Sequence, residues 1–201
     1  AVEMLYLMEA KTAALEELRQ LNLRLQSARA EAQAQALTDT LTGLRNRRGM
    51  DLALEDHFAR GAPFSLVHLD LDRFKQINDA HGHAAGDLVL KVSARRLAAQ
   101  ARPGDTVARI GGDEFVLIFA GLLSRAAMSD VAERLIAALE EPVSFEGTRL
   151  RVSASVGITS TTPGAARDPA EMLHHADLAL YASKRAGRGR HRHYEPGIEG
   201  G

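Results

Sequence analysis

Apolar residues recur at a helical spacing along the first 37 residues of the chain. This segment has no Gly or Pro and is rich in Ala, Leu, Glu, Gln and Arg, which favour helices. Steps of alternately three and four residues select a seam of Met4, Leu7, Lys11, Ala14, Leu18, Leu21, Leu25, Ala28, Ala32 and Gln35. Most of this seam is apolar, and its period of about 3.5 residues is that of a coiled coil. We expect residues 1–37 to form a coiled-coil signalling helix that joins two chains; the alternative is an amphipathic helix folded back on the rest of the chain.

The rest of the pattern, residues 38–195, predicts one globular domain, and residues 196–201 a disordered tail. Expected helices are 47–60, 87–102, 124–141 and 169–185, and expected strands are 65–71, 106–110, 115–119, 143–145 and 148–158. The strand at 65–71 is apolar on both faces and should be central. The last two strands should pair as a hairpin about Glu146 and Gly147. Helices and hairpins mix without strict alternation, which favours an α+β fold with a central, mostly antiparallel sheet surrounded by helices.

Composition and charge exclude several classes of function. The formal net charge of −1 provides no basic field for nucleic acid or a membrane surface, so we expect neither as a partner. The absence of cysteine excludes disulfides and thiolate metal sites. No apolar stretch approaches the roughly 20 residues that span a bilayer. We therefore expect a cytoplasmic location, and we expect the chain to be a piece of a longer protein with a sensor domain upstream.

Two glycines and two acids stand between the strands expected at 106–110 and 115–119. Gly111 and Gly112 predict a tight primed turn with positive φ at both positions, and they would let a ligand approach the backbone. Asp113 and Glu114 follow at the rim of an apolar strand, where carboxylates are costly unless a cation or hydrogen bonds compensate them. Taken alone, the segment is also typical of an ordinary hairpin turn with solvated acids.

A second acidic cluster, Asp70 and Asp72, ends the expected central strand. Mg²⁺ and Mn²⁺ are commonly held by one or two carboxylates together with phosphate oxygens and waters. Asp70 and Asp113 on neighbouring strands would meet that need. A calcium loop of the EF-hand type is excluded, because Phe74 and Lys75 stand where it requires Asp or Asn and then Gly. Lys75, near the start of a short helix, is suited to stabilising phosphate charge, although most lysines are simply solvated.

Together these segments resemble the GGDEF-domain diguanylate cyclases over roughly residues 39–190. The motifs stand in the family's order at 39–47 (DTLTGLRNR), 70–79 (DLDRFKQIND), 82–87 (GHAAGD), 111–115 (GGDEF), 155–158 (SVGI) and 176–188 (ADLALYASKRAGR). One motif alone would be weak, but the ordered set is specific.

The resemblance implies a fold akin to nucleotidyl-cyclase and polymerase palm domains, and an enzyme that condenses two GTP molecules into cyclic di-GMP with Mg²⁺ or Mn²⁺. It implies that Asp70, the Leu71 carbonyl and Asp113 hold the metal. It also implies that Asp113 accepts the proton of the attacking 3′-hydroxyl with Glu114 assisting, and that Lys75 stabilises charge on the transferring phosphate.

The resemblance further implies a set of residues that bind GTP. Asn78 and Asp87 would read the guanine edge and His83 would line the pocket, whereas Lys184 and Arg188 would contact the triphosphate. A carboxylate at Asp87 can accept from guanine N1–H and N2–H, which adenine lacks. The alternatives for Asn78 and Asp87 are a helix C-terminal turn and a helix N-cap.

Two further features follow from the resemblance. One site holds one GTP while the product needs two, so we expect a homodimer of facing half-sites. Arg102 and Asp105 match the RxxD element through which family members bind cyclic di-GMP for feedback inhibition. That pattern could also be a plain Pro-Gly turn, and it recurs at 48–51. The rival interpretations are an inactive nucleotide receptor and a purely structural coiled-coil module.

Overall fold

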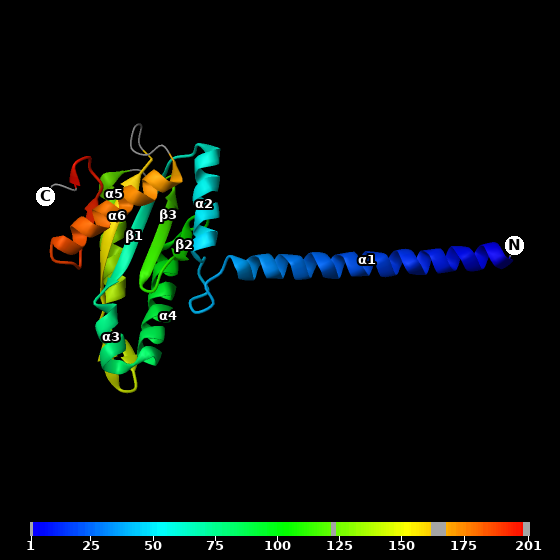
Figure 1. The fold of residues 1–201 in the computed structure, drawn as a ribbon, viewed down its shortest axis with the longest axis horizontal. Coiled ribbons are helices and arrows are strands. Elements are labelled where there is room, and N and C mark those ends of the chain that lie inside the picture. The colour runs from blue at the N-terminus through cyan, green and yellow to red at the C-terminus, as the bar shows by residue number, and fades with distance from the viewer. Residues whose placement is uncertain (1, 122–123, 162–167, 199–201) are drawn as a thin grey trace. The chain divides into compact units, whose positions relative to one another are not determined.

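The computed structural model describes residues 2–121, 124–161 and 168–198. Its elements are labelled in Figure 1. The chain divides into two compact units, residues 1–37 and 38–201. Across the described part, every helix is too short or too polar to cross a bilayer. The last three residues of the tail predicted to be disordered lie outside the described residues.

The first unit is one long helix, α1 (Val2–Ala36), as its composition predicts. Met4, Leu18, Leu21 and Leu25 of the predicted seam are between 56% and 65% exposed in the single chain. The side chain of Leu7 lies outside the described part. An exposed apolar seam is what a second helix requires for coiled-coil pairing. The pairing itself stays a prediction.

A five-stranded sheet with the order β2-β3-β1-β6-β7 forms the centre of the second unit. The strands are β1 (Phe64–Asp72), β2 (Thr106–Arg109), β3 (Glu114–Ala120), β6 (Ser153–Ser160) and β7 (His191–His193). All neighbouring pairs are antiparallel except β6 and β7, which are parallel. The predicted α+β fold with a mostly antiparallel sheet is therefore confirmed, and so is the central position of β1.

Helices cover both faces of this sheet, and the alternation of side chains along the strands divides the core between them (Figure 1). The helices are α2 (Arg47–Arg60), α3 (Phe74–His81), α4 (His83–Gln100), α5 (Arg125–Glu140) and α6 (Pro169–Arg185). Leu69 and Leu117 belong to the core shared with α4 and α5. Leu66 and Ile118 belong to the core shared with α2 and α6. Successive residues of β1 thus serve opposite faces, which explains why the strand is apolar on both.

Helix α6 lies so close to β6 at Gly157 that no side chain fits there. A Cβ atom at this position would collide with the backbone carbonyl of Ala176 and the backbone amide of Leu180, both in α6. The glycine of the SVGI motif therefore sets the distance between α6 and the sheet.

Two predictions about strand connections were wrong. The expected strand 148–158 is two strands, because β5 (Thr148–Leu150) pairs only with β4 (Val143–Phe145), whereas β6 pairs with β1. The chain leaves one sheet and enters another between them. The expected primed turn is also wrong, since neither Gly111 nor Gly112 has positive φ. The Ile110 amide donates to the Glu114 carbonyl at 3.0 Å, so the strands are joined by a wider turn that does not need left-handed backbone.

One helix boundary and one strand also differ from those expected. The helix predicted to start at Asp87 starts at His83, so Asp87 lies inside α4 and is not its N-cap. The Gly-rich segment after α6 contains β7, which the sequence pattern did not predict. With three residues, β7 is too short to show a period.

Candidate active site

Three carboxylates meet where β1 ends and β3 begins. In the antiparallel register Asp70 pairs with Glu114, and the Leu71 amide donates to the Asp113 carbonyl at 3.1 Å. Asp113 directly precedes β3, and its side chain is half-buried, like those of Asp70 and Glu114. The structure thus brings Asp70 and Asp113 to neighbouring strand ends, as the order of the strands predicts.

The electrostatics of this cluster favour a bound cation. Burial raises the pKa of Asp70, and repulsion from Asp113 and Asp72 raises it further against the opposing effect of Lys184. Burial likewise raises the pKa of Asp113, and repulsion from Glu114 adds to this against the opposing effects of a backbone hydrogen bond, Lys184 and Arg109. A positive charge placed between these groups would relieve both effects.

One protein cation already reaches the cluster. The Lys184 ammonium, in the last turn of α6, lies 2.8 Å from Oδ2 of Asp70. The two side chains are 30% and 14% exposed, so the pair is partly shielded from water. Arg109 also acts on Asp113, but it is already paired with Asp39. One ammonium does not balance Asp70, Asp113 and Glu114, so the cluster keeps an excess of negative charge.

Asp72, the second acid of β1, has a different task. Its Oδ1 accepts from the Ser155 hydroxyl at 2.7 Å, and its Oδ2 accepts from the Gly189 amide at 2.9 Å. Arg188 lies beside it, with Nε 3.9 Å from Oδ1. Asp72 therefore fastens the loop after α6, which carries Arg188, to the end of β1. Sequence reasoning did not assign this role, although the alternating acids of β1 put Asp72 on the same face as Asp70.

The residues predicted to bind guanine lie on α3 and α4, which pack against each other. Asn78 is half-buried, whereas Lys75, His83 and Asp87 are exposed. Gly86 is the reason that Asn78 fits, because a Cβ on Gly86 would collide with Oδ1 of Asn78. The glycine of the 82–87 motif thus positions the asparagine of the 70–79 motif.

Two arginines hold the carbonyls of the turn between β2 and β3. Arg109 donates to the Gly112 carbonyl from Nε at 3.1 Å and from Nη2 at 2.9 Å. Arg47 Nε donates to the Ile110 carbonyl at 3.2 Å. Arg109 Nη1 also reaches both carboxylate oxygens of Asp39. Sequence reasoning missed the contacts of Arg47 with Ile110 and of Arg109 with Asp39, because no local pattern links positions so far apart in the chain.

Comparison with known proteins decides the family. Residues 36–190 match the family model described as "Diguanylate cyclase, GGDEF domain". The chain belongs to this family. The diguanylate cyclase TpbB of Pseudomonas aeruginosa is 40% identical over 195 residues, covering 94% of this chain and 45% of the relative. DgcP, another diguanylate cyclase of that organism, is 44% identical over 160 residues, covering 77% of this chain and 23% of the relative. The chain therefore spans less than half the length of these relatives.

Solved GGDEF structures share the fold. The coiled coil and GGDEF domain of DgcB from Caulobacter crescentus, in complex with c-di-GMP, has a TM-score of 0.80 at 30% identity and covers 90% of this chain and 97% of that one. The GGDEF domain of TpbB has a TM-score of 0.73 at 39% identity, covering 80% of this chain and 96% of that one. These likenesses agree with the α+β architecture described above.

The donor set of this GGDEF domain fits a hard divalent cation. Among the described residues, no three His, Asp or Glu side chains form a ready-made metal cage. Asp70 and Asp113 instead offer two half-buried carboxylates whose pKa values are both raised by burial and by neighbouring negative charge. Mg²⁺ is typically bound by one or two carboxylates, with the remaining ligands coming from substrate phosphates and water. The chain thus has the donors for such an ion beside a phosphate ligand.

The RxxD pattern of this GGDEF domain forms a turn just before β2. Asp105 Oδ2 accepts from the Arg102 amide at 2.8 Å, and its Oδ1 accepts from the Ala120 amide at 3.1 Å. The Arg102 side chain is exposed, and Arg134 of α5 lines the same small hollow. Asp105 therefore shapes the turn, and within the described part of the chain neither arginine of this hollow makes an ion pair. The second copy of the pattern, Arg48 to Asp51, lies in α2.

A buried histidine lies beneath the acidic cluster. His68 of β1 is 7% exposed, and neither ring nitrogen has a hydrogen-bond partner among the residues that the structure describes. Burial lowers its pKa, although Glu114, Asp177 and Asp70 act in the opposite direction. Its Nδ1 lies 3.8 Å from Oδ1 of Asp177. Sequence reasoning missed His68, and the only signal was one polar residue in an otherwise apolar stretch.

Proposed function

We propose that the chain is a diguanylate cyclase, which joins two GTP molecules into cyclic di-GMP and releases two pyrophosphates. The observation that carries the proposal is the meeting of Asp70, Asp113 and Glu114 at one end of the sheet, with Lys184 against Asp70. Membership of the GGDEF family supports the same reaction.

Each of the two bonds in the product forms in the same way. The 3′-oxygen of one GTP forms a bond to the α-phosphorus of the other, and the bond from that phosphorus to the oxygen bridging to the β-phosphate breaks. Asp113 accepts the proton of the 3′-hydroxyl, with Glu114 assisting, and pyrophosphate leaves. Asp70, the Leu71 carbonyl and Asp113 would hold Mg²⁺ or Mn²⁺, which when bound neutralises phosphate charge and makes the hydroxyl more acidic.

Three cations of the chain serve the phosphates in this proposal. Lys75 stabilises charge on the transferring phosphate, and Lys184 and Arg188 bind the triphosphate. In this structure Lys184 is paired with Asp70 and Arg188 lies beside Asp72, so both cations stand at the edge of the acidic cluster. We propose that Lys184 exchanges Asp70 for the triphosphate when GTP binds.

Recognition of guanine falls to α3 and α4. The Asp87 carboxylate accepts from guanine N1–H and N2–H, the Asn78 amide can donate to or accept from the guanine edge, and His83 lines the pocket. Adenine would leave the Asp87 acceptors unpaired at a cost of about 1–3 kcal/mol, which favours GTP over ATP.

The helix α1 supplies the second half-site by pairing two chains. Its exposed seam, with Leu18, Leu21 and Leu25, supports a homodimeric coiled coil. A sensor elsewhere in the full-length protein would then act through the register of the pair. An insertion of four residues after Gln26 shifts the seam, whereas one of seven preserves it. We expect the first to change turnover and the second to leave it similar; equal turnover in both would contradict regulation through the register.

Product inhibition is the role that we propose for Arg102 and Asp105. Arginine pairs well with phosphate and stacks on guanine. Cyclic di-GMP titrated into Arg102→Ala should inhibit at least about tenfold more weakly than in the native chain, as expected when a charge-assisted hydrogen bond is lost. Arg48→Ala, in the second RxxD copy, is the matched control. Undiminished inhibition of Arg102→Ala would refute the assignment.

The decisive experiment is incubation with GTP and Mg²⁺, followed by chromatographic separation of the products. We expect cyclic di-GMP and pyrophosphate in a ratio of one to two. Cyclic di-GMP that binds without GTP turnover would instead identify a receptor. Neither binding nor turnover would identify a structural module.

A further inference from the structure

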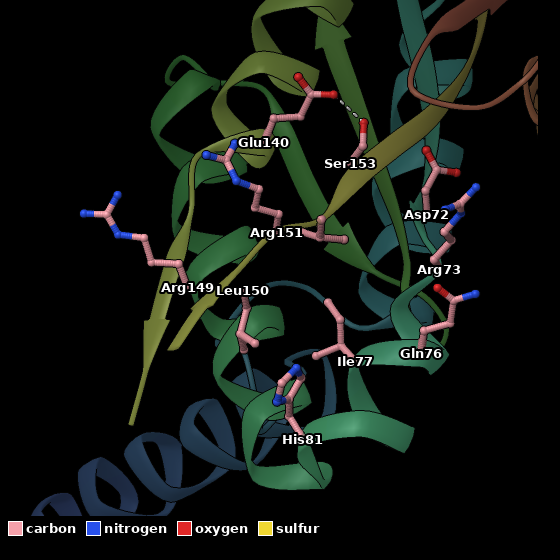
Figure 2. Close-up of a pocket in the computed structure, with 11 residues that line it drawn as sticks. Asp72, Arg73, Gln76, Ile77, His81, Glu140, Arg149, Leu150, Arg151 and Ser153 are labelled. Carbon is pink, nitrogen blue, oxygen red and sulfur yellow. Dashed lines mark hydrogen bonds between the residues drawn. The ribbon is translucent and has the colours of Figure 1, made fainter. Parts of the chain in front are cut away.

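A cavity borders the residues assigned to GTP without including any of them in its lining. It has a volume of about 620 Å³ and is formed by the end of β1, by α3, by the end of α5 and by the link from β5 to β6 (Figure 2). None of the proposed GTP contacts (Lys75, Asn78, His83, Asp87, Lys184 and Arg188) lines it. Its size is within the range of sites for small organic ligands.

The charges on the wall of this cavity favour an anion. Arg73 and Arg151 line it and are exposed, and neither makes an ion pair with any described residue. The two acids in the wall are already engaged: Asp72 by Ser155 and Gly189, and Glu140 by the Ser153 hydroxyl at 2.6 Å. Among the described residues only Asp72 also has a cationic neighbour, Arg188 at 3.9 Å, so three arginines of the wall face one uncompensated carboxylate, that of Glu140. This excess of positive charge favours an anion, and guanidinium matches phosphate with paired hydrogen bonds.

The floor of the cavity favours a flat organic group. Ile77 of α3 and Leu150 of β5 line it from different walls (Figure 2). Val152, between β5 and β6, also belongs to the lining. The Gln76 amide and the His81 ring supply hydrogen-bonding groups beside this apolar surface. A planar base against apolar side chains, with its phosphate near arginine, satisfies both parts of the lining.

The backbone conformation of Arg73 further supports a binding site at this cavity. Arg73 precedes α3 with φ of 59° and ψ of 23°, a left-handed conformation that is costly for a residue other than Gly, Asn or Asp. That conformation puts the start of α3, and with it Gln76 and Ile77, at the wall of the cavity. Arg73 and Arg151 stand on opposite sides of the cavity, Arg73 beside Asp72 and Arg151 beside Glu140 (Figure 2). We propose that this cavity is a nucleotide site, which binds the base against Ile77 and Leu150 and uses one arginine for the phosphate and the other for the polar edge of the base.

The test uses adenosine monophosphate with the full chain in EDTA, so that neither guanine recognition nor a divalent ion contributes. Amide NMR spectra of the ¹⁵N-labelled protein would follow the titration. We expect shifts at Gln76, Ile77, Leu150 and Arg151. Binding should weaken about tenfold in Arg151→Ala and in Arg73→Asn, since each loses a charge-assisted hydrogen bond. Asn is chosen at position 73 because it tolerates left-handed backbone.

The matched control is Arg149→Ala. Arg149 also borders the cavity, but its side chain extends away from the other lining residues (Figure 2). Binding by this variant should equal that of the native chain, and dispersed spectra would show that all variants are folded. Equal binding by the native chain and Arg151→Ala would overturn the proposal, as would the absence of shifts at these residues. Pyrophosphate that binds as tightly as the nucleotide would also overturn it, because the base would then contribute nothing. Cyclase activity is not needed for any of these outcomes.

Discussion

The Arg109 guanidinium binds both carboxylate oxygens of Asp39, with Nη1 3.1 Å from each. The pair joins the segment after α1 to the turn that carries the GGDEF residues, because Arg109 also donates to the Gly112 carbonyl. Burial alone would raise the pKa of Asp39, but hydrogen bonds from Thr42 and Arg109 outweigh it and hold this pKa below its ordinary value. The carboxylate is therefore ionised over the working range of pH.

Removing this carboxylate should weaken both the fold and the reaction. We expect Asp39→Asn to lower the free energy of unfolding by about 1–3 kcal/mol, since the largely buried Arg109 loses its charged partner. Turnover of GTP should fall by about tenfold or more, because the turn before Asp113 loses its support. Urea unfolding and initial rates measure the two effects.

The control for that variant is Asp56→Asn. Asp56 pairs with Arg60 one helical turn away, and both side chains are more than half exposed. Such a pair contributes less than about 0.5 kcal/mol. Equal stability losses for Asp39→Asn and Asp56→Asn would contradict the role given to the Arg109 pair.

Gly157→Ala should destabilise the domain strongly. The new methyl group meets the α6 backbone at Ala176 and Leu180, and backbone cannot move aside as a flexible side chain can. We expect a loss of about 3 kcal/mol or more in the free energy of unfolding. Gly112→Ala is the matched substitution, because a Cβ there meets no atom within 4 Å and its φ is not left-handed. A denaturation midpoint for Gly157→Ala close to that of Gly112→Ala would disprove the packing argument.

Gly86→Ala should impair GTP binding with little loss of stability. The methyl group displaces the Asn78 side chain, so we expect the KM for GTP to rise by about tenfold, the effect of one lost hydrogen bond to a polar base edge. A double-mutant cycle with Asn78→Ala measures the link. In the Asn78→Ala background the additional effect of Gly86→Ala should nearly vanish, and full additivity would show that Gly86 acts elsewhere.

Acid should destabilise the domain through His193. Burial lowers the pKa of His193 to about 4 from the model-peptide value of 6.5, and Nε2 lies 2.9 Å from the Ser129 hydroxyl. The unfolded chain therefore binds a proton at a higher pH than the native chain does. This contribution to stability is complete above about pH 6.5 and is lost as the pH falls toward about 4.

The raised pKa values of Asp70 and Asp113 have the opposite effect on stability, because they favour the native state as the pH falls. The test therefore compares the native chain with a His193 variant, in which the contribution of the two aspartates is the same. Unfolding free energy would be measured from pH 7 to pH 4 for the native chain and for His193→Gln, whose amide can keep a hydrogen bond to Ser129. The native chain should lose more stability over this interval than the variant. Parallel curves would exclude His193 as the source.

The sequence predicts the parts of the site that depend on strand order and on local turn-forming or helix-capping residues. The apolar stretch of β1 followed by Asp70, and the glycines followed by Asp113, are enough to expect both acids at neighbouring strand ends. Helices α2 and α6 begin and end where Asn46, Gly61 and Pro169 predict. These features are readable because each is encoded within a few residues.

Contacts between distant segments were not predictable in this way. These contacts depend on how the completed layers are stacked. They include Asp72 with Gly189, Arg109 with Asp39, and Gly157 with α6. The glycine turn was misjudged because a pair of adjacent glycines allows left-handed backbone without requiring it. The extra hydrogen bond from Ile110 to Glu114 selects the wider turn.

In the proposed reaction Asp70 and Asp113 share one ion beside the bound nucleotide, and Mn²⁺ binding tests this directly. Electron paramagnetic resonance would count Mn²⁺ bound in the presence of a non-reactive GTP analogue. We expect binding to the native chain and to a Glu140→Gln control, with affinity at least about a hundredfold lower in Asp70→Asn and in Asp113→Asn, since each loses a charged ligand. Mn²⁺ bound equally well by all four proteins would contradict the shared site.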